Sequence, residues 1–334
     1  MIVVLFLNWL LYFLVWSDIV GGHILGRNTA ATPPKEIELP PLPSTLHVQA
    51  SSFNFDLEKA LPPASSTLAQ LADLPSNCAL EQGAGGECSQ SSMVATNVTY
   101  EDCGDAFTIC RCNDANMTMD IAVDRLARVP VGLRRFVGTA FVLGDATTHA
   151  YTNLSTGDIH LFGDSAMDTW IHEASHAFDF SSSYSVPSSS DAWQDAISND
   201  TCVPDRYSLL NRVENFAQMS VIKIYMLLHS GNLPPGFQAD CMSKQLDFMD
   251  SLPLYNANNL FGNTCAIDPP GARKTNPPAL LDASRTFMTV SLDPTPNPSE
   301  TPTRPSSALS WTHGNSVLRK TCLFVAFYLI VNLM

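Results

Sequence analysis

The chain has 334 residues, of which 45% are hydrophobic, and it carries a formal net charge of -14 at pH 7. This length is enough for one large domain or two small ones with a sizeable core. The excess of acidic residues argues against a nucleic-acid partner, which would need a basic face, and it suits solubility in an extracellular medium.

The N-terminal end is an almost unbroken apolar run over residues 2–16, followed by the small residue Ser17. This pattern predicts a signal peptide over residues 1–17. The run lacks the usual basic start, so a signal anchor is the alternative. Residues 18–47 hold several prolines and little apolar periodicity, and we expect a linker or a pro-segment there.

Residues 48–266 are predicted to form the folded domain, in the α+β class. Apolar spacing predicts an amphipathic helix over residues 119–133, which Pro130 bends or ends. Three strands are expected over residues 136–143, 150–153 and 158–162, and two longer helices over residues 166–180 and 206–228.

Beyond this domain, residues 267–306 are rich in Pro, Ser and Thr, which predicts an extended stalk. The small residues from Ser306 to Ala308 are followed by a polar spacer and a short apolar terminus, which is the order of a GPI-attachment signal. We therefore predict that residues 307–334 are removed and that a lipid attached at Ser306 tethers the protein to the cell surface. A tail anchor or a plain apolar tail is the alternative.

The chain has nine cysteines, and one of them, Cys322, lies in the apolar tail. The other eight are an even number, which can form four disulfides in an oxidising compartment. No Cys-x-x-Cys pair occurs, and this disfavours a zinc site built from cysteines. Four glycosylation sequons add to the indication of a secreted glycoprotein. They are Asn97, Asn116, Asn153 and Asn199.

The strongest motif is His172-Glu173-Ala174-Ser175-His176, inside the helix predicted over residues 166–180. Positions four apart on a helix point to nearly the same side, so both imidazoles can bind one zinc ion. Glu173 leans to that side and can act as a general base toward a water. The alternative is an accidental surface pattern, which the helix and the strand before it disfavour.

A catalytic zinc needs a third protein ligand, and the candidates downstream are Asp179, Asp205 and Glu214. Asp179 follows His176 on the same helix, which suits a supporting contact better than a bond to the same ion. Glu214 is the better candidate because its predicted helix can cross the first one. If that helix is unbroken, Tyr207 shares the face of Glu214, and its hydroxyl could stabilise an oxyanion. A core or surface tyrosine is the alternative.

These segments resemble the catalytic domains of anthrax lethal factor-like metallopeptidases over about residues 158–228. In that family a His-Glu-x-x-His-x-x-Asp segment precedes a tyrosine and a Glu-x-Phe-Ala segment, here Glu214-Asn215-Phe216-Ala217. The resemblance implies a zincin-like α+β fold: a small mixed sheet packs on the active-site helix, and a second helix carries the third ligand. Gln218 stands where the family usually has an acid, and its amide oxygen could still orient a ligand imidazole, with weaker polarisation.

Two further resemblances concern fungal proteins. Deuterolysin-like peptidases are similarly small, secreted and rich in disulfides, but their Gly-Thr-x-Asp segment is missing here, and Asp205 is the nearest substitute. The chain also resembles fungal secreted proteins, some of them called conidiation-specific, that carry a similar His-Glu-Ala-Ser-His-Ala segment.

The sequence thus predicts a secreted or GPI-anchored monomeric zinc metalloendopeptidase that acts on a protein or peptide. The alternative is a catalytically silent zincin-fold glycoprotein of the cell surface or wall, with a structural or interaction role. His160, in the preceding strand, is expected to be a strand residue and not a ligand. The predicted site comprises the zinc ligands His172, His176 and Glu214, the catalytic residues Glu173 and Tyr207, and the supporting residues Asp179 and Gln218.

Overall fold

The computed structural model describes residues 37–42, 50–83, 85–88, 92–181, 186–234, 237 and 240–262. The predicted signal peptide, the stalk and the lipid-attachment signal with Ser306 lie outside the described residues. Most of the predicted linker lies outside them as well. Among the described residues, no helix is both long enough and apolar enough to cross a membrane.

The described elements mix helices and strands, which confirms the predicted α+β class. The strands are β1 (Ser66–Gln70), β2 (Met93–Tyr100), β3 (Ala106–Cys112), β4 (Thr139–Leu143), β5 (His149–Asn153) and β6 (Asp158–Phe162). The α-helices are α2 (Ala50–Ala60), α3 (Ser76–Glu81), α4 (Met119–Arg128), α5 (Val131–Arg134), α6 (Met167–Ser181), α7 (Asp191–Asn199), α8 (Arg212–Leu228), α9 (Ser243–Ser251) and α10 (Ala257–Phe261). The short 3-10 turns are η2 (Pro187–Ser189), η3 (Tyr207–Leu209) and η4 (Asp240–Met242).

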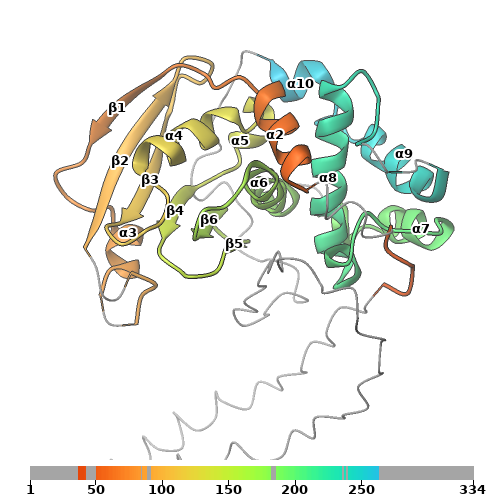
Figure 1. The fold of residues 1–334 in the computed structure, drawn as a ribbon, viewed down its shortest axis with the longest axis horizontal. Helices are drawn as coiled ribbons and strands as arrows, with labels where there is room; N and C mark the ends of the chain where they lie inside the picture. The colour runs from red at the N-terminus through yellow and green to blue at the C-terminus, as the bar shows by residue number, and fades with distance from the viewer. Residues whose placement is uncertain are drawn as a thin grey trace, which may run out of the picture. The chain divides into compact units, whose positions relative to one another are not determined.

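The strands form one mixed sheet in the order β1-β2-β3-β4-β6-β5. The pairs β3–β4 and β4–β6 are parallel, and the other pairs are antiparallel. Strand β5 lies at one edge, and its register places Thr152 opposite Ile159 of β6. In Figure 1, α6 lies between this end of the sheet and α8, while α7 and α9 lie on the far side of α8. Helix α6 is therefore enclosed on two sides, and nearly all of its side chains are buried.

Two sequence-based boundaries need correction. The helix expected over residues 119–133 ends at Arg128, and Pro130, which was expected to bend or end it, precedes a separate short helix, α5. The helix expected over residues 206–228 is broken as well. Asn211 has an extended backbone, and its side chain accepts hydrogen bonds from the amides of Val213 and Glu214, so it caps a new helix, α8. An N-cap residue has non-helical backbone angles, which is why Tyr207 lies in the separate turn η3.

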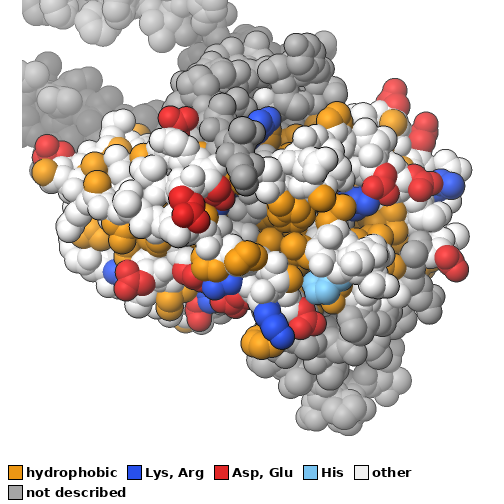
Figure 2. Space-filling model, turned by 90° about the horizontal axis from the view of Figure 1, so that it is seen from above, with side chains coloured by type: hydrophobic (Ala, Val, Ile, Leu, Met, Phe, Trp, Pro, Cys, Tyr) orange, Lys and Arg blue, Asp and Glu red, His pale blue; other side chains and the backbone are white. Residues whose placement is uncertain are grey.

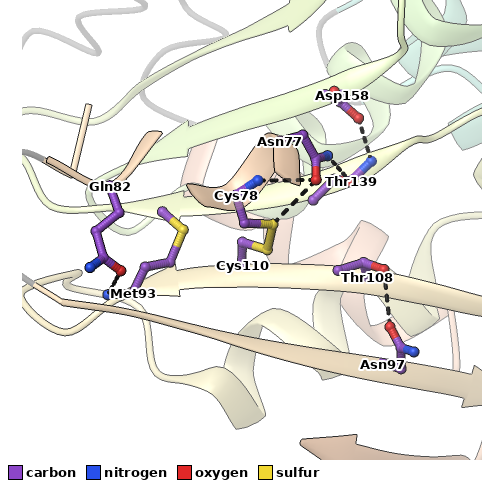
Figure 3. Close-up of a disulfide and its surroundings, with 9 residues drawn as sticks. All are labelled: Asn77, Cys78, Gln82, Met93, Asn97, Thr108, Cys110, Thr139 and Asp158. Atoms are coloured by element: carbon purple, nitrogen blue, oxygen red, sulfur yellow. Dashed lines mark hydrogen bonds between the residues drawn. A yellow bond between two sulfur atoms is a disulfide. The ribbon is translucent and has the colours of Figure 1, made fainter. Parts of the chain in front are cut away.

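Disulfides join the helix α3 region to the centre of the sheet. Cys78 of α3 is bonded to Cys110 of β3, as Figure 3 shows. Beside it, Asn77 donates a 2.7 Å hydrogen bond to the hydroxyl of Thr139 at the start of β4. The carboxylate of Asp158 accepts a 2.6 Å hydrogen bond from the amide of Thr139. This cluster therefore ties α3, β3, β4 and β6 together.

Two further disulfides, Cys88–Cys112 and Cys202–Cys241, are formed, and Cys103 is also disulfide-bonded. These bonds agree with the predicted disulfide framework as far as the described residues extend. Figure 2 shows acidic side chains scattered over one face, and the lysine and arginine side chains on it form no continuous patch.

Part of the predicted linker is built into the fold. The amide of Leu42 donates to the carbonyl of Val203, and the amide of Val203 donates to the carbonyl of Pro40. The amide of Ile37 donates to the carbonyl of Leu209 in η3. Residues 37–42 therefore run along the segment that leads into η3 and α8.

Candidate metal centre

Helix α6 places the histidine pair in the interior. His172 and His176 are each 5% exposed, and Glu173 is 2% exposed. Their spacing brings both imidazole rings to the side of α6 that faces α8, and the Nε2 atoms of the two rings are 3.0 Å apart. Burying three ionisable groups together is costly unless they are paired or hold an ion.

The third side chain comes from α8. A carboxylate oxygen of Glu214, Oε2, lies 3.0 Å from Nε2 of His172 and 3.2 Å from Nε2 of His176. Three atoms at these separations can all lie about 2.0–2.2 Å from one ion, as zinc requires of nitrogen and oxygen ligands. The donor set of two imidazoles and one carboxylate also suits zinc. The residues present therefore fit the metal that the motif implies.

The cap of α8 directs Glu214 toward the histidines. Glu214 is the third residue after the cap Asn211, whose side chain accepts its amide hydrogen at 3.1 Å. A glutamate at this position often turns back to the amide of the cap residue. Here its carboxylate instead points to α6. The positive end of the helix dipole favours a carboxylate in the first turn.

The ionisable groups of the site stabilise the charged forms of one another. Burial disfavours a charged imidazolium at His176, but attraction from Glu214, together with a hydrogen bond to it, raises the pKa of His176 to about 9. Burial likewise opposes ionisation of Glu214, and the charge of His176 with hydrogen bonds from both histidines outweighs it, so the pKa of Glu214 is lowered. Since histidine binds a metal through its neutral ring, metal binding here has to displace protons.

Glu173 points from the same helix toward the edge strand. Its Oε2 atom is 2.7 Å from the hydroxyl of Thr152 on β5, and its main-chain oxygen is 2.9 Å from that hydroxyl. The glutamate is thus adjacent in sequence to a candidate ligand and is fixed by the sheet. This is a suitable position for a general base.

Tyr207 lies at the site although the predicted continuous helix was wrong. Its ring centroid is 5.5 Å from that of His172. Burial raises the pKa of Tyr207, and the charges of Glu214 and Glu173 and a hydrogen bond with Glu214 raise it further. The tyrosine therefore keeps its proton and can donate a hydrogen bond.

The two residues predicted to support the ligands differ in how they are held. Asp179 is fully buried and accepts hydrogen bonds from the amide and the hydroxyl of Ser188, at 2.9 and 2.5 Å. Burial raises the pKa of Asp179 to about 6, although both hydrogen bonds from Ser188 lower it. Gln218 is partly buried one turn after Glu214, and no hydrogen bond joins it to either histidine. The structure thus gives Asp179 a clear anchoring contact and Gln218 none.

The remaining candidates lie apart from this cluster. Asp205, the alternative third ligand, accepts hydrogen bonds from the amide and hydroxyl of Ser208 and is not part of the group that could hold a metal. His160 is a buried strand residue, stacked on Tyr151 and hydrogen bonded to Glu87. A second group that could hold a metal consists of Cys88, Cys112 and Asp114. Its two cysteines are bonded to each other in a disulfide, so their sulfur atoms are not available as thiolate ligands.

The four sequons lie at different exposures. Asn116, Asn153 and Asn199 are exposed, whereas Asn97 is half-buried in β2 and accepts a hydrogen bond from the hydroxyl of Thr108. Glycosylation of all four asparagines stays a prediction.

The sequence analysis missed contacts of three residues that shape the site: Thr152, Ser188 and Asn211. A signal existed for Asn211, because Asn-x-x-Glu before an apolar run is typical of a helix start. The contacts of Thr152 and Ser188 depend on how distant segments pack, and no local pattern indicates them.

Comparison with known proteins identifies the family. The family model of conidiation-specific protein Con-13 matches residues 50–251. The chain belongs to the Con-13 family. The matched region contains the whole sheet and all three candidate ligands. The resemblance to fungal conidiation-specific proteins is thereby confirmed, while the name of the family states no biochemical activity.

A curated relative of this Con-13 family member is "Conidiation-specific protein 13" of Neurospora crassa. The two are 29% identical over 147 residues, which cover 41% of this chain and 42% of the relative. The chain therefore matches less than half of the relative's length. No solved structure matches the chain.

Proposed function

We propose that this Con-13 family protein is a secreted zinc metalloendopeptidase with a zincin-like arrangement. The observation that carries the proposal is the buried convergence of His172, His176 and Glu214, whose three ligand atoms lie within 3.2 Å of one another. The adjacent Glu173 supplies the base that hydrolysis needs. The order of strand β6, helix α6 and a crossing helix α8 agrees with the arrangement implied by the resemblance to lethal factor-like peptidases.

Different residues of the chain have different roles in the proposed peptide hydrolysis. The zinc ion, when bound, supplies Lewis-acid chemistry that activates a water and polarises the peptide carbonyl. His172, His176 and Glu214 would hold it. Glu173 takes a proton from the attacking water and passes it to the leaving amine. Tyr207, kept neutral by its surroundings, donates a hydrogen bond to the oxyanion.

The substrate in this proposal is a protein or peptide outside the cell, which adds as a further strand beside β5, an edge strand of the sheet formed by the described residues. The disulfides support export to an oxidising compartment. We propose a monomer that is held at the cell surface or wall by the predicted lipid anchor.

One observation favours a second candidate, a metal-stabilised but catalytically silent glycoprotein. The base Glu173 is almost fully buried, and one of its carboxylate oxygens already accepts a hydrogen bond from the Thr152 hydroxyl. In this alternative the three ligands would serve the stability of the fold, and Glu173 would be a structural residue.

The test uses the full chain, exported so that its disulfides form, and the variant Glu173→Gln. We expect both proteins to bind zinc, and we expect the variant to cleave an unfolded protein substrate about 10²–10⁴-fold more slowly. Glu101→Gln, at an exposed turn, is the matched control and should behave as wild type. Wild type that binds zinc and does not cleave would support the silent glycoprotein. Wild type that binds no zinc rejects both.

A further inference from the structure

A hydroxyl of the edge strand β5 donates a hydrogen bond to Glu173, the candidate general base. We infer that Thr152 of β5 is a positioning residue that holds the Glu173 carboxylate in place for proton transfer. This role rests on the proposed peptidase function. The inference comes from the 2.7 Å contact between the Thr152 hydroxyl and Oε2 of Glu173.

The Thr152 hydroxyl lies within hydrogen-bonding distance of two acceptors on Glu173. Thr152 has one hydroxyl hydrogen, and it lies 2.7 Å from the Glu173 carboxylate and 2.9 Å from the Glu173 main-chain oxygen. The carboxylate is therefore the preferred acceptor. Its other oxygen, Oε1, is then left to receive the proton of the attacking water.

The Thr152 hydroxyl is held rigidly by its own side chain and by strand β5. Thr152 is β-branched, so its side chain has few rotamers, and it is only 9% exposed, so water competes little for its hydrogen. Its neighbour Tyr151 points to the opposite face of the sheet, where its hydroxyl donates a 2.7 Å hydrogen bond to Glu87 and its ring stacks on His160. Strand β5 is thus anchored on one face while it holds Glu173 on the other.

A flexible glutamate has several rotamers, and a general base needs one. Holding a reacting group in the correct geometry can account for a large part of a rate enhancement, and a misplacement of about 1 Å can cost about 10²-fold. Because the hydrogen bonds of the Thr152 hydroxyl go to Glu173 and to none of the three ligand side chains, the hydroxyl should affect proton transfer and leave metal binding unchanged.

The experiment compares Thr152→Val, which keeps the shape and loses the hydroxyl, with Thr152→Ser, which keeps the hydroxyl. We expect Thr152→Val to lower kcat about 10- to 100-fold, with KM and zinc affinity unchanged, and Thr152→Ser to restore most of kcat. Thr139→Val is the matched control, since Thr139 is 8% exposed in the same sheet and its hydroxyl is hydrogen bonded to Asn77 (Figure 3), which is not a site residue. It should lower stability and leave kcat unchanged.

Thermal unfolding of the metal-free protein provides a readout that needs no activity. We expect Thr152→Val to lower Tm by about 2–4 °C, and by less when Glu173 is already alanine, because the carboxylate partner is then missing. Equal shifts in both backgrounds would show that the hydroxyl and the carboxylate do not interact, which overturns the inference.

The remaining outcomes separate this inference from the proposed function. If wild type cleaves and Thr152→Val matches Thr139→Val in kcat, or if Thr152→Ser does not restore activity, the positioning role is wrong and the peptidase proposal stands. If wild type does not cleave at all, the peptidase proposal fails and the positioning role fails with it.

Discussion

The region around α3 and β3 and the interface between α6 and α8 are stabilised in different ways. In the first region, covalent bonds join neighbouring elements, as in the Cys78–Cys110 and Cys88–Cys112 disulfides. In the second, neither helix contains a cysteine, and buried polar side chains converge where apolar ones would pack at lower cost. The disulfides of the first region serve stability. The buried polar cluster of the second region suits the proposed functional role better than it suits stability.

The interface between α6 and α8 also leaves polar atoms unsatisfied. Within the described part of the chain, the Nδ1 atom of His176 is buried without a hydrogen-bond partner. Both histidines direct Nε2 to a single oxygen of Glu214. A network that serves stability alone would satisfy each group separately. The convergence on one point supports the proposed ion-binding role, and the following predictions test how separate the two regions are.

The largest effect is expected when the carboxylate ligand is neutralised. Glu214→Gln should weaken zinc binding by more than about 100-fold, because changes in residues that only support ligands already cost 10- to 100-fold. Competition with a chromogenic chelator measures the zinc affinity, with the exposed Glu101→Gln as control. Equal zinc affinities of Glu214→Gln and wild type would show that Glu214 is not a ligand.

Removal of a disulfide should affect stability and leave the metal centre unchanged. The double variant Cys78→Ala with Cys110→Ala opens a link between positions 32 residues apart and should lower the free energy of unfolding by about 2–4 kcal/mol. Urea unfolding of the metal-free protein measures this change. The zinc affinity of the folded variant should equal that of wild type, and a coupled loss would show that the two regions are not independent.

Asp179 should make the stability of the metal-free protein depend on pH. Its pKa rises from 3.8 to about 6 on folding, so the folded state binds this proton more tightly. The contribution is fully present below pH 4 and is lost as the pH rises to about 6, on the order of 1–3 kcal/mol. Asp179→Asn should lack this decline.

Urea unfolding of both proteins between pH 4 and pH 7 tests the prediction for Asp179. A difference in unfolding free energy between wild type and variant that is constant over this range would contradict it. Ser188→Ala is the companion variant, because it removes the hydroxyl that donates to Asp179 and keeps the titrating group.

A smaller effect is expected from the cap that positions Glu214. Asn211→Ala removes the acceptor for the amides of Val213 and Glu214 and should lower stability by about 1 kcal/mol, together with a several-fold loss of zinc affinity. Thr118→Ala removes the cap of α4, a helix that carries none of the site residues. It should cost similar stability with no change in zinc affinity. If both variants bind zinc equally well, the cap does not position Glu214.

The local part of this structure follows from the sequence. The bounds of β6 and the helical spacing of His172 and His176 follow from short-range patterns. The pairing of β1 with β2 and of β2 with β3 depends on contacts between distant residues, and no motif in those segments indicated it. The break before α8 was missed because apolar spacing continues across Asn211, while its capping hydrogen bonds stop the helix. Thr152 could not be assigned to Glu173 without knowing which face of β5 meets α6.

The central claim is that His172, His176 and Glu214 hold one zinc ion. X-ray absorption at the zinc edge of the purified, dialysed full chain tests it most directly. We predict one zinc per chain, with two imidazole nitrogens and carboxylate or water oxygens at about 2.0–2.2 Å and no sulfur ligand. A protein without bound zinc, or a spectrum with sulfur at about 2.3 Å, would contradict the claim.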